Sequence, residues 1–333
     1  MKLLVIGGTM FIGRHFVQEA LQRGHEITLF YRGKHGTDLF PEAEHICGDR
    51  DGDLALLDGR TWDAVYDTCG YVPRIVGMSA AALASRVNRY VFVSTISVYG
   101  DVRTAGIDED APLATMEDES VEEINWTTYG PLKVLCERAV EEAVQGRSLI
   151  VRPGMIIGPY DYSDRFTYWP HRIAQGEDVL APAPSTQPVQ LIDARDMSIW
   201  ILDMIEQEKI GVYNATGPDY ALTMGDMLQI CNDAAGNPAG IVWVDGEFLD
   251  EQEVSADKLP FWVPDQGGET AAIFQTNVDK AIADGLTFRA LRDTVDDTMA
   301  YLRARPADTP FRAGLTREHE AELLTAWRTR QGS

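Results

Sequence analysis

The segment GGTMFIG, residues 7–13, constrains the fold more than any other part of the sequence. It follows a short apolar run at residues 3–6 and leads into an amphipathic, helix-forming segment at residues 11–23. Glycines after a buried strand permit a tight turn, and the first amide groups of the next helix then face an anion such as a dinucleotide pyrophosphate. The segment therefore predicts the first strand, turn and helix of a nucleotide-binding α/β sheet.

The glycine turn carries one unusual residue. Gly7 and Gly8 allow the sharp exit from the strand, and Gly13 lets the helix pack close to the sheet. Met10 stands where such a turn usually has its second glycine, and we expect its side chain to cover the phosphates. The residues expected to line the pyrophosphate are Gly7, Gly8, Thr9, Met10, Phe11, Ile12 and Gly13.

Short β-rich runs alternate with amphipathic segments through the first half of the chain. We expect strands at residues 3–7, 26–31, 43–47, 63–68, 89–95 and 148–153, with helices at about 11–23, 74–86 and 131–144. Later elements are expected as strands at 189–193 and 211–217, and as helices near 195–207, after Thr223, and near 289–304 and 316–329. The alternation predicts a Rossmann-type, doubly wound parallel sheet with a smaller, discontinuous C-terminal substrate lobe.

This pattern also suggests a division of the chain into two parts. We assign residues 1–153 plus about 189–212 to the NAD(P)-binding domain. Residues of about 154–188 and 213–333 then form the substrate-binding lobe. The aromatic run at 258–268 is expected either to pack in that lobe or to form a lid over the cleft.

Composition excludes some classes of partner. The 333 residues carry a formal charge of −23, which argues against binding to nucleic acid or to anionic membranes, because phosphate groups require a basic face. The apolar start is too short for a signal peptide or a membrane span, and no other stretch approaches that length. We therefore expect a cytoplasmic protein, with the acidity open to explanation by a salt-rich habitat.

The cysteines and histidines are scattered. The four cysteines form no CxxC pair and the six histidines form no cluster with carboxylates, so a reducing compartment and no bound metal are expected.

The end of the second expected strand bears on the choice of cofactor. Sites specific for NAD usually end this strand with an acid, whereas Tyr31 and Arg32 stand here. An arginine at this place pairs with a 2′-phosphate, which favours NADP over NAD, although a solvated surface arginine is the alternative. Asp49, after the third strand, is placed to accept a hydrogen bond from the adenine amino group.

The catalytic candidates are Tyr129 and Lys133 in the segment TTYGPLK. Residues four apart share one face of a helix, so the ammonium would lower the pKa of the phenol while the phenol exchanges a proton with a substrate oxygen. Thr95, at the end of the fifth strand, would offer its hydroxyl to the same oxygen. The three residues predict an acid–base set for a secondary alcohol or ketone.

The motifs GGTMFIG, GDRD, FVSTISVYG, YGPLK, RPGMIIGP and VQLIDARD occur in this order along nearly the whole chain. In this order they resemble the extended short-chain dehydrogenases/reductases, the NAD-dependent epimerase/dehydratase group. The GGTxFIG turn resembles a divergent branch that includes chloroplast stem-loop-binding proteins, some of which lack the catalytic pair that is intact here.

The resemblance implies roles for individual residues. It places the catalytic hydroxyl at Thr95, the general acid/base at Tyr129 and the lysine at Lys133, which would also bind the nicotinamide ribose. The remaining implied cofactor contacts are Tyr31, Arg32, Asp49, Arg50, Cys69, Gly70, Ser94, Pro153, Gly154 and Met155. Substrate contacts are expected at Thr95, Ser97, Arg165, Tyr168, Gln190 and Arg195.

These observations leave three functions open. The first is an NAD(P)-dependent epimerase or oxidoreductase that acts on a sugar-like, and by resemblance nucleotide-sugar, substrate. The second is an NADPH-dependent reductase of a small non-sugar carbonyl, and the third is a non-catalytic nucleotide- or RNA-binding scaffold. Ile96 and Ser97 after Thr95 disfavour a dehydratase, which commonly has Asp-Glu there. Proteins of the family that the chain resembles tend to dimerise through a helical bundle, and the resemblance therefore implies a homodimer.

Overall fold

The structure, a computed structural model, describes residues 1–264, 271–306 and 308–332. Its centre is a sheet of seven parallel strands in the order β10-β6-β5-β4-β1-β2-β3. The strands are β1 (Lys2–Ile6), β2 (Glu26–Tyr31), β3 (Glu44–Cys47), β4 (Trp62–Asp67), β5 (Val87–Val93), β6 (Ser148–Pro153) and β10 (Gly211–Ala215). This is the Rossmann-type doubly wound sheet that the sequence predicts.

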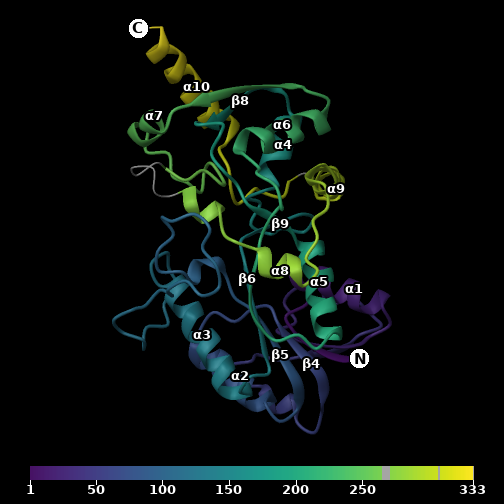
Figure 1. Ribbon diagram of the computed structural model, residues 1–333. Coiled ribbons are helices and arrows are strands. Elements are labelled where there is room, and N and C mark those ends of the chain that lie inside the picture. Colours follow the sequence, from purple (N-terminus) through teal and green to yellow (C-terminus); the bar gives the residue numbers. More distant parts are fainter. Residues whose placement is uncertain (265–270, 307, 333) are drawn as a thin grey trace.

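Helices cover both faces of the sheet. In Figure 1, α1 (Phe11–Gln22) and α5 (Ala194–Glu206) lie on one side of the strands, and α2 (Pro73–Leu83) and α3 (Tyr129–Val144) lie on the other. Alternate residues of β1 serve the two layers, because Leu3 and Val5 belong to the apolar core beneath α1 and α5, whereas Leu4 and Ile6 belong to the core beneath α2 and α3. Burial on both faces explains why this strand is a continuous apolar run.

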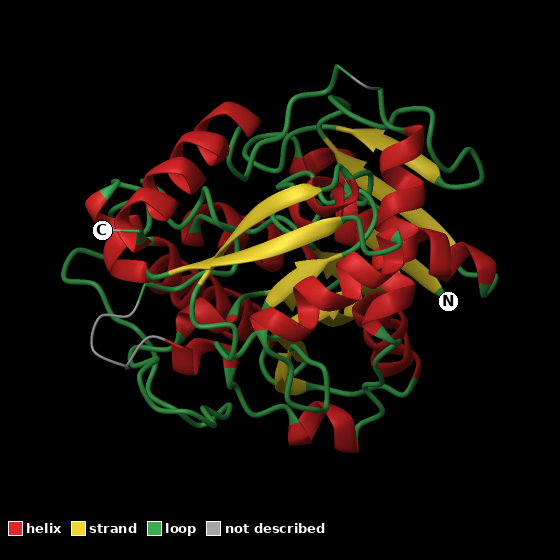
Figure 2. Cartoon of the chain, turned by 90° about the horizontal axis from the view of Figure 1, so that it is seen from above, coloured by secondary structure: helices red, strands yellow, loops and turns green. Residues whose placement is uncertain are grey.

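A second group of elements follows the sheet strands and has its own apolar core. Two small sheets occur here, the pair β8 (Glu177–Pro182) and β11 (Ala239–Val244) and the pair β7 (Met155–Ile157) and β9 (Leu191–Asp193). Figure 2 shows the β8–β11 pair crossing the front of the molecule between helices. The helices of this part are α4 (Tyr168–Ala174), α6 (Met224–Ala235), α7 (Gly246–Glu251), α9 (Leu291–Ala304) and α10 (Arg317–Gln331).

Three 3-10 turns and one short helix complete the part of the chain that the structure describes. They are η1 (Leu54–Leu57), η2 (Ile96–Val98), η3 (Ala271–Phe274) and α8 (Asp279–Ala283). Within the part of the chain that the structure describes, no helix combines the length and the apolar character that crossing a membrane requires.

The strands and helices predicted from the sequence are present, with ends that move by a few residues. Thr223 caps α6 as predicted, with its hydroxyl accepting from the Asp226 amide and the Asp226 carboxylate accepting in return. The elements β7, β8, β11, α4, α7 and α8 were not predicted from the sequence. We retain the division into an NAD(P)-binding domain and a substrate-binding lobe as a proposal, and the separate core of the second group supports it.

The aromatic run at 258–268 falls partly outside the described residues, which exclude 265–270. In its described part, Leu259, Phe261 and Trp262 are buried in the core of the second group. These three side chains therefore pack in the core and do not form a lid.

Candidate active site

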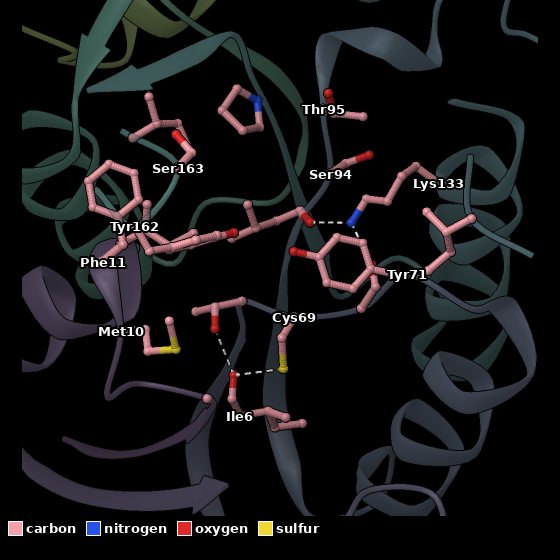
Figure 3. A pocket seen from close by; sticks show the side chains of 18 of the residues that line it. Ile6, Met10, Phe11, Cys69, Tyr71, Ser94, Thr95, Lys133, Tyr162 and Ser163 are labelled. Carbon is pink, nitrogen blue, oxygen red and sulfur yellow. Dashed lines mark hydrogen bonds between the residues drawn. The ribbon is translucent and has the colours of Figure 1, made fainter. Parts of the chain in front are cut away.

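A cavity of about 700 Å³ opens at the carboxyl ends of the central strands. Its walls come from the turn after β1, the ends of β2, β4 and β5, the start of α3, and the segment after β6 (Figure 3). The strand order reverses at β1, which has β2 on one side and β4 on the other. Such a switch point is where doubly wound sheets bind their ligands.

The turn at Gly7 and Gly8 forms the floor of this cavity. Both residues have positive φ angles, of 102° and 92°, which glycine adopts without the steric cost of a side chain. A Cβ atom at Gly13 would lie 2.7 Å from the Gly8 Cα, so only glycine lets the start of α1 pack against the turn. The predicted roles of these three glycines in shaping the turn thus have a steric basis.

The start of α1 can accept an anion. Met10 precedes the helix and provides no side-chain hydrogen bond to it, and the Arg14 amide makes a backbone bond to the Met10 carbonyl. The earlier amides of the first turn therefore have no side-chain acceptor, which fits a pyrophosphate at this place. Met10 itself is 42% exposed and lines the cavity, as Figure 3 shows, so its side chain is available to lie over a bound phosphate.

The end of β2 presents a basic group of side chains. Arg32, Lys34 and His35 are exposed and line the cavity. In a chain with a net charge of −23, three basic residues at the place of an adenosine ribose favour a ligand with an added phosphate. Of these three residues, only Arg32 was predicted from the sequence, and Lys34 and His35 lie two and three positions after it.

Tyr31 precedes this basic group in the sequence, and Asp49 follows it after β3. The Tyr31 hydroxyl shares a hydrogen bond of 2.8 Å with His45 Nδ1, so it is engaged with β3. Asp49 lines the cavity and accepts a bond from the Asp51 amide through one carboxylate oxygen.

Arg50 touches the cavity but its guanidinium is engaged inside the protein. It donates to both carboxylate oxygens of Asp67, at 2.9 Å and 2.7 Å, and to the Ser79 hydroxyl. Burial alone would raise the pKa of Asp67, but the charge and hydrogen bonds of Arg50 outweigh it and hold the pKa below the usual value. Arg50 therefore stabilises the part of the cavity wall around Cys69 and Gly70, and its guanidinium has few N–H groups left to donate to a cofactor.

The three catalytic candidates meet at the other end of the cavity. Tyr129 is the first residue of α3, Lys133 lies one turn later, and Thr95 precedes η2 and receives a bond from the Ser97 amide. Partial burial raises the pKa of Tyr129 above its usual value, although the Thr95 hydroxyl and the charge of Arg165 act in the opposite direction. The structure thus places Thr95 and Tyr129 in the same cavity wall.

Lys133 differs from the sequence expectation. Its ammonium donates to the carbonyl oxygens of Gly70, at 2.6 Å, and Val93, at 2.7 Å, as Figure 3 illustrates for the wall beside Tyr71. Burial lowers its pKa to about 8. The net direction for the pKa of Tyr129 is upward, because burial is its largest cause, and a lowering of that pKa by Lys133 stays a prediction.

Two tyrosines that the sequence analysis missed stand across the cavity from each other. Tyr71 lies beside Lys133, whose Nζ is 5.3 Å from the Tyr71 ring centroid, and Tyr162 packs edge-on against Phe11 at 6.4 Å (Figure 3). Burial is the main cause that raises the pKa of Tyr71. In the sequence, these two tyrosines are marked only by their positions, directly after Cys69-Gly70 and shortly after Gly158-Pro159.

The expected substrate residues separate into two groups. Ser97, Thr95 and Arg165 line the cavity. Tyr168, Gln190 and Arg195 do not, which corrects their predicted place.

Each of the three displaced residues serves the packing of the chain. Tyr168 is 3% exposed within the core of the second group. The Gln190 amide bonds to the Thr276 backbone in both directions, and Arg195 forms an ion pair with Asp193 at 2.7 Å. Sequence proximity to the expected substrate segment did not reveal which way these side chains turn.

The remaining predicted residues lie in the wall. Cys69, Gly70, Ser94, Pro153, Gly154 and Met155 all line the cavity. Over residues 1–264, 271–306 and 308–332, no group of three or more His, Cys, Asp or Glu side chains is arranged to hold a metal ion.

Comparison with known proteins confirms the resemblance. Residues 61–216 match the model of the NAD dependent epimerase/dehydratase family. The chloroplast stem-loop binding protein of 41 kDa b from Arabidopsis thaliana is 27% identical over 266 residues, which cover 71% of this chain and 64% of that protein. A UDP-glucose 4-epimerase from Lactobacillus helveticus is 28% identical over 161 residues, or 41% of this chain and 46% of that enzyme. The chain thus spans about half to two thirds of the length of these two relatives.

A solved structure shows the same fold. The UDP-glucuronic acid 4-epimerase from Bacillus cereus in complex with NAD superposes with a TM-score of 0.67, covering 91% of this chain and 99% of that one at 19% identity. At this identity the likeness concerns the fold, and the chemistry rests on the side chains described above.

Proposed function

We propose that this chain, which belongs over residues 61–216 to the NAD dependent epimerase/dehydratase family, transfers hydride at a secondary alcohol or ketone of a sugar-like substrate. One observation carries the proposal. Thr95 and Tyr129 line the same cavity as an uncapped helix start that fits a pyrophosphate. The groups for acid–base chemistry and the site for a dinucleotide therefore lie in one cavity, where a substrate and a cofactor could bind side by side.

The cavity residues divide the binding of a nicotinamide dinucleotide among them. The first amides of α1 would hold its pyrophosphate, and Asp49 would accept from the adenine amino group. Arg32, with Lys34 beside it, would pair with a 2′-phosphate, so we propose NADP over NAD. When bound, the nicotinamide supplies or accepts the hydride.

Tyr129 is proposed to move the proton. Because its pKa lies above the ordinary value, the phenol is protonated at neutral pH and can donate to a substrate carbonyl oxygen. Thr95 would hold the same oxygen through its hydroxyl. In the opposite direction, Tyr129 would accept the proton of the substrate hydroxyl after it has lost its own.

Lys133 is proposed to shape the wall and to bind the nicotinamide ribose. Its two bonds, to the Gly70 and Val93 carbonyls, tie together the ends of β4 and β5. Its third proton is available to a ribose hydroxyl, and a pKa of about 8 leaves the group charged at neutral pH.

Two alternative functions remain to be tested, of which one is a different enzyme activity and the other a non-catalytic role. The basic group at Arg32 favours a reductase that exchanges NADPH, acting on a small non-sugar carbonyl. The likeness to a stem-loop binding protein favours a nucleotide-sensing or RNA-binding scaffold. A charge of −23 and an intact set of Thr95, Tyr129 and Lys133 argue against the scaffold. We propose a cytoplasmic homodimer in either case.

The first experiment releases the bound nucleotide from freshly purified protein by denaturation and identifies it by mass spectrometry. Retained NAD or NADP supports an epimerase, which regenerates its cofactor within one cycle. An empty site, with NADPH binding more tightly than NADH on titration, supports the reductase. Failure to bind either nucleotide contradicts the enzyme proposal, and an RNA-binding assay then examines the scaffold.

A further inference from the structure

The loop between β7 and α4 contributes two charged side chains to the cavity, Asp161 and Arg165. Among the described residues after Pro153, no other charged side chain lines it. The two influence each other electrostatically but form no ion pair in the described part of the chain. Each is therefore available to a different group of a ligand.

Arg165 has no carboxylate partner among the described residues. Its guanidinium donates to the Ser163 hydroxyl at 3.2 Å and lies 3.6 Å from the Met155 sulfur, both of which line the cavity. Other arginines of this half of the chain are neutralised by carboxylates, among them in the pairs Arg172–Glu320, Arg195–Asp193, Arg289–Asp196 and Arg305–Asp164. The cavity thus receives one available positive charge from this side.

Arg165 acts close to the proposed proton donor. Burial is the larger influence on the pKa of Tyr129 and raises it, while the charge of Arg165 works to lower it. An anion held by Arg165 would therefore sit near the reacting carbon and not at the distant end of a long substrate.

Asp161 has one carboxylate oxygen that lacks a partner. The side chain is 2% exposed, and its Oδ1 accepts from the Ser163 amide at 2.8 Å and from the Ser163 hydroxyl at 2.6 Å. Its Oδ2 is buried and accepts no hydrogen bond from the described residues. A buried carboxylate oxygen without a donor is costly, and because Asp161 lines the cavity, a rotation of its carboxylate toward the cavity would let a ligand donor stabilise this oxygen.

We infer that the substrate is a polyhydroxy compound with a single anionic group, which Arg165 holds while Asp161 accepts a hydrogen bond from a neighbouring hydroxyl. The anion is a carboxylate or a phosphate monoester. A nucleoside diphosphate sugar would bring two phosphates, for which the described residues offer only Arg165 on this side of the cavity. The inference rests on the proposed function, because it places the substrate beside Tyr129.

Binding is measured by tryptophan fluorescence on the full chain with four probes: D-glucuronate, D-glucose 6-phosphate, D-glucose and UDP-glucose. We expect one of the two anionic hexoses to bind at least about tenfold more tightly than glucose, and the stronger of them identifies the anion. Arg165→Gln should abolish this difference and Arg165→Lys should keep part of it. The control Arg303→Gln, an exposed arginine outside the cavity, should change nothing.

Asp161→Asn examines the second contact, since the amide keeps an oxygen for Ser163 and loses the free acceptor. It should weaken glucuronate severalfold and leave cyclohexanecarboxylate, which has no hydroxyls, unchanged.

Three outcomes overturn the inference: equal affinity for glucose and both anions, no binding of either anion, or tightest binding of UDP-glucose with no effect of Arg165→Gln. Because binding is read without turnover, these results are independent of the proposed function. Anion binding that depends on Arg165 but gives no hydride transfer with NAD or NADP supports the substrate site and contradicts only the proposed reaction.

Discussion

Individual residues decide which chemistry the cavity can perform. Thr95 and Tyr129 come from different parts of the chain, yet both line one cavity in the folded protein. Partial burial keeps the phenol protonated at neutral pH, and the same burial makes Lys133 a weaker base than a free lysine. Proton transfer, choice of cofactor and the pH response of the site can therefore each be tested at one residue.

Tyr129→Phe removes the proposed proton donor and leaves the ring. We expect kcat to fall by about 100-fold or more, with the affinity for NADPH unchanged, because general acid–base catalysis contributes on that order. The matched control is Tyr220→Phe, an exposed tyrosine outside the cavity, which should retain full activity. An active Tyr129→Phe enzyme would contradict the assignment.

Arg32→Gln removes the central charge of the basic group after β2. NADPH affinity should fall about tenfold while NADH affinity stays the same, because only NADPH carries the 2′-phosphate that pairs with the guanidinium. Isothermal titration with both nucleotides provides the measurement. Equal losses for both would show that Arg32 holds the dinucleotide in another way.

Lys133 makes stability depend on pH in a defined window. Its pKa is lowered from 10.5 to about 8 by burial, so between these values the unfolded chain binds the proton and the folded chain does not. Stability should therefore rise with pH from about 8 to about 10, by up to about 1.4 kcal/mol per pH unit. Comparison of urea unfolding of the wild type with Lys133→Met isolates this slope, and parallel pH profiles would contradict it.

At the scale of elements, the approach of α1 to the turn after β1 prepares the cofactor site. Gly13 permits it, because the Gly8 Cα lies 2.7 Å from where a Cβ would be. The helix starts without a side-chain cap, so its first amides are left for a ligand. The start of α1 can therefore both pack against the turn and bind an anion.

Gly13→Ala should separate α1 from the turn. We expect at least about a tenfold loss of NAD(P) affinity, since the added methyl group displaces the amides that face the pyrophosphate. Gly77→Ala is the matched control on another helix, where the new Cβ would contact only Ala139 at an ordinary 3.6 Å. Unchanged binding by the Gly13 variant would show that the turn adapts.

At the scale of the whole molecule, the C-terminal helix closes the second core. Glu320 of α10 is 2% exposed, accepts from Arg172 of α4 at 2.6 Å and from the Leu180 amide of β8 at 3.0 Å. One carboxylate thus joins three elements that are far apart in the sequence. Its removal leaves the Arg172 charge buried and without that partner.

Glu320→Ala should lower the free energy of unfolding by roughly 3–5 kcal/mol, the usual cost of breaking a buried ion pair from one side. Glu322→Ala, an exposed glutamate on the same helix, should cost little. Urea unfolding followed by both tryptophan fluorescence and cofactor release would also show whether the proposed substrate lobe unfolds before the nucleotide-binding domain. A fully stable Glu320 variant would contradict the role of this pair.

Much of the architecture was predictable from local pattern. Alternating strands and helices, the glycine turn, the Thr223 cap and the set of Thr95, Tyr129 and Lys133 all depend on spacing that neighbouring residues determine. The less regular segment after Pro153 was not predictable in this way. Its β7, β8 and α4 are short and pair with distant chain, so their periodicity is weak.

By itself, the sequence determined the parallel sheet, the position of the nucleotide turn and the residue types for acid–base chemistry, because each is encoded within a few adjacent residues. Only the tertiary structure decided that, of the expected substrate residues, Arg165 lines the cavity whereas Tyr168, Gln190 and Arg195 turn away from it, and that Asp161 joins Arg165 there. The direction of a side chain depends on partners brought from elsewhere in the chain. A carboxylate removes an arginine such as Arg195 from the site, and the lack of one leaves Arg165 in it.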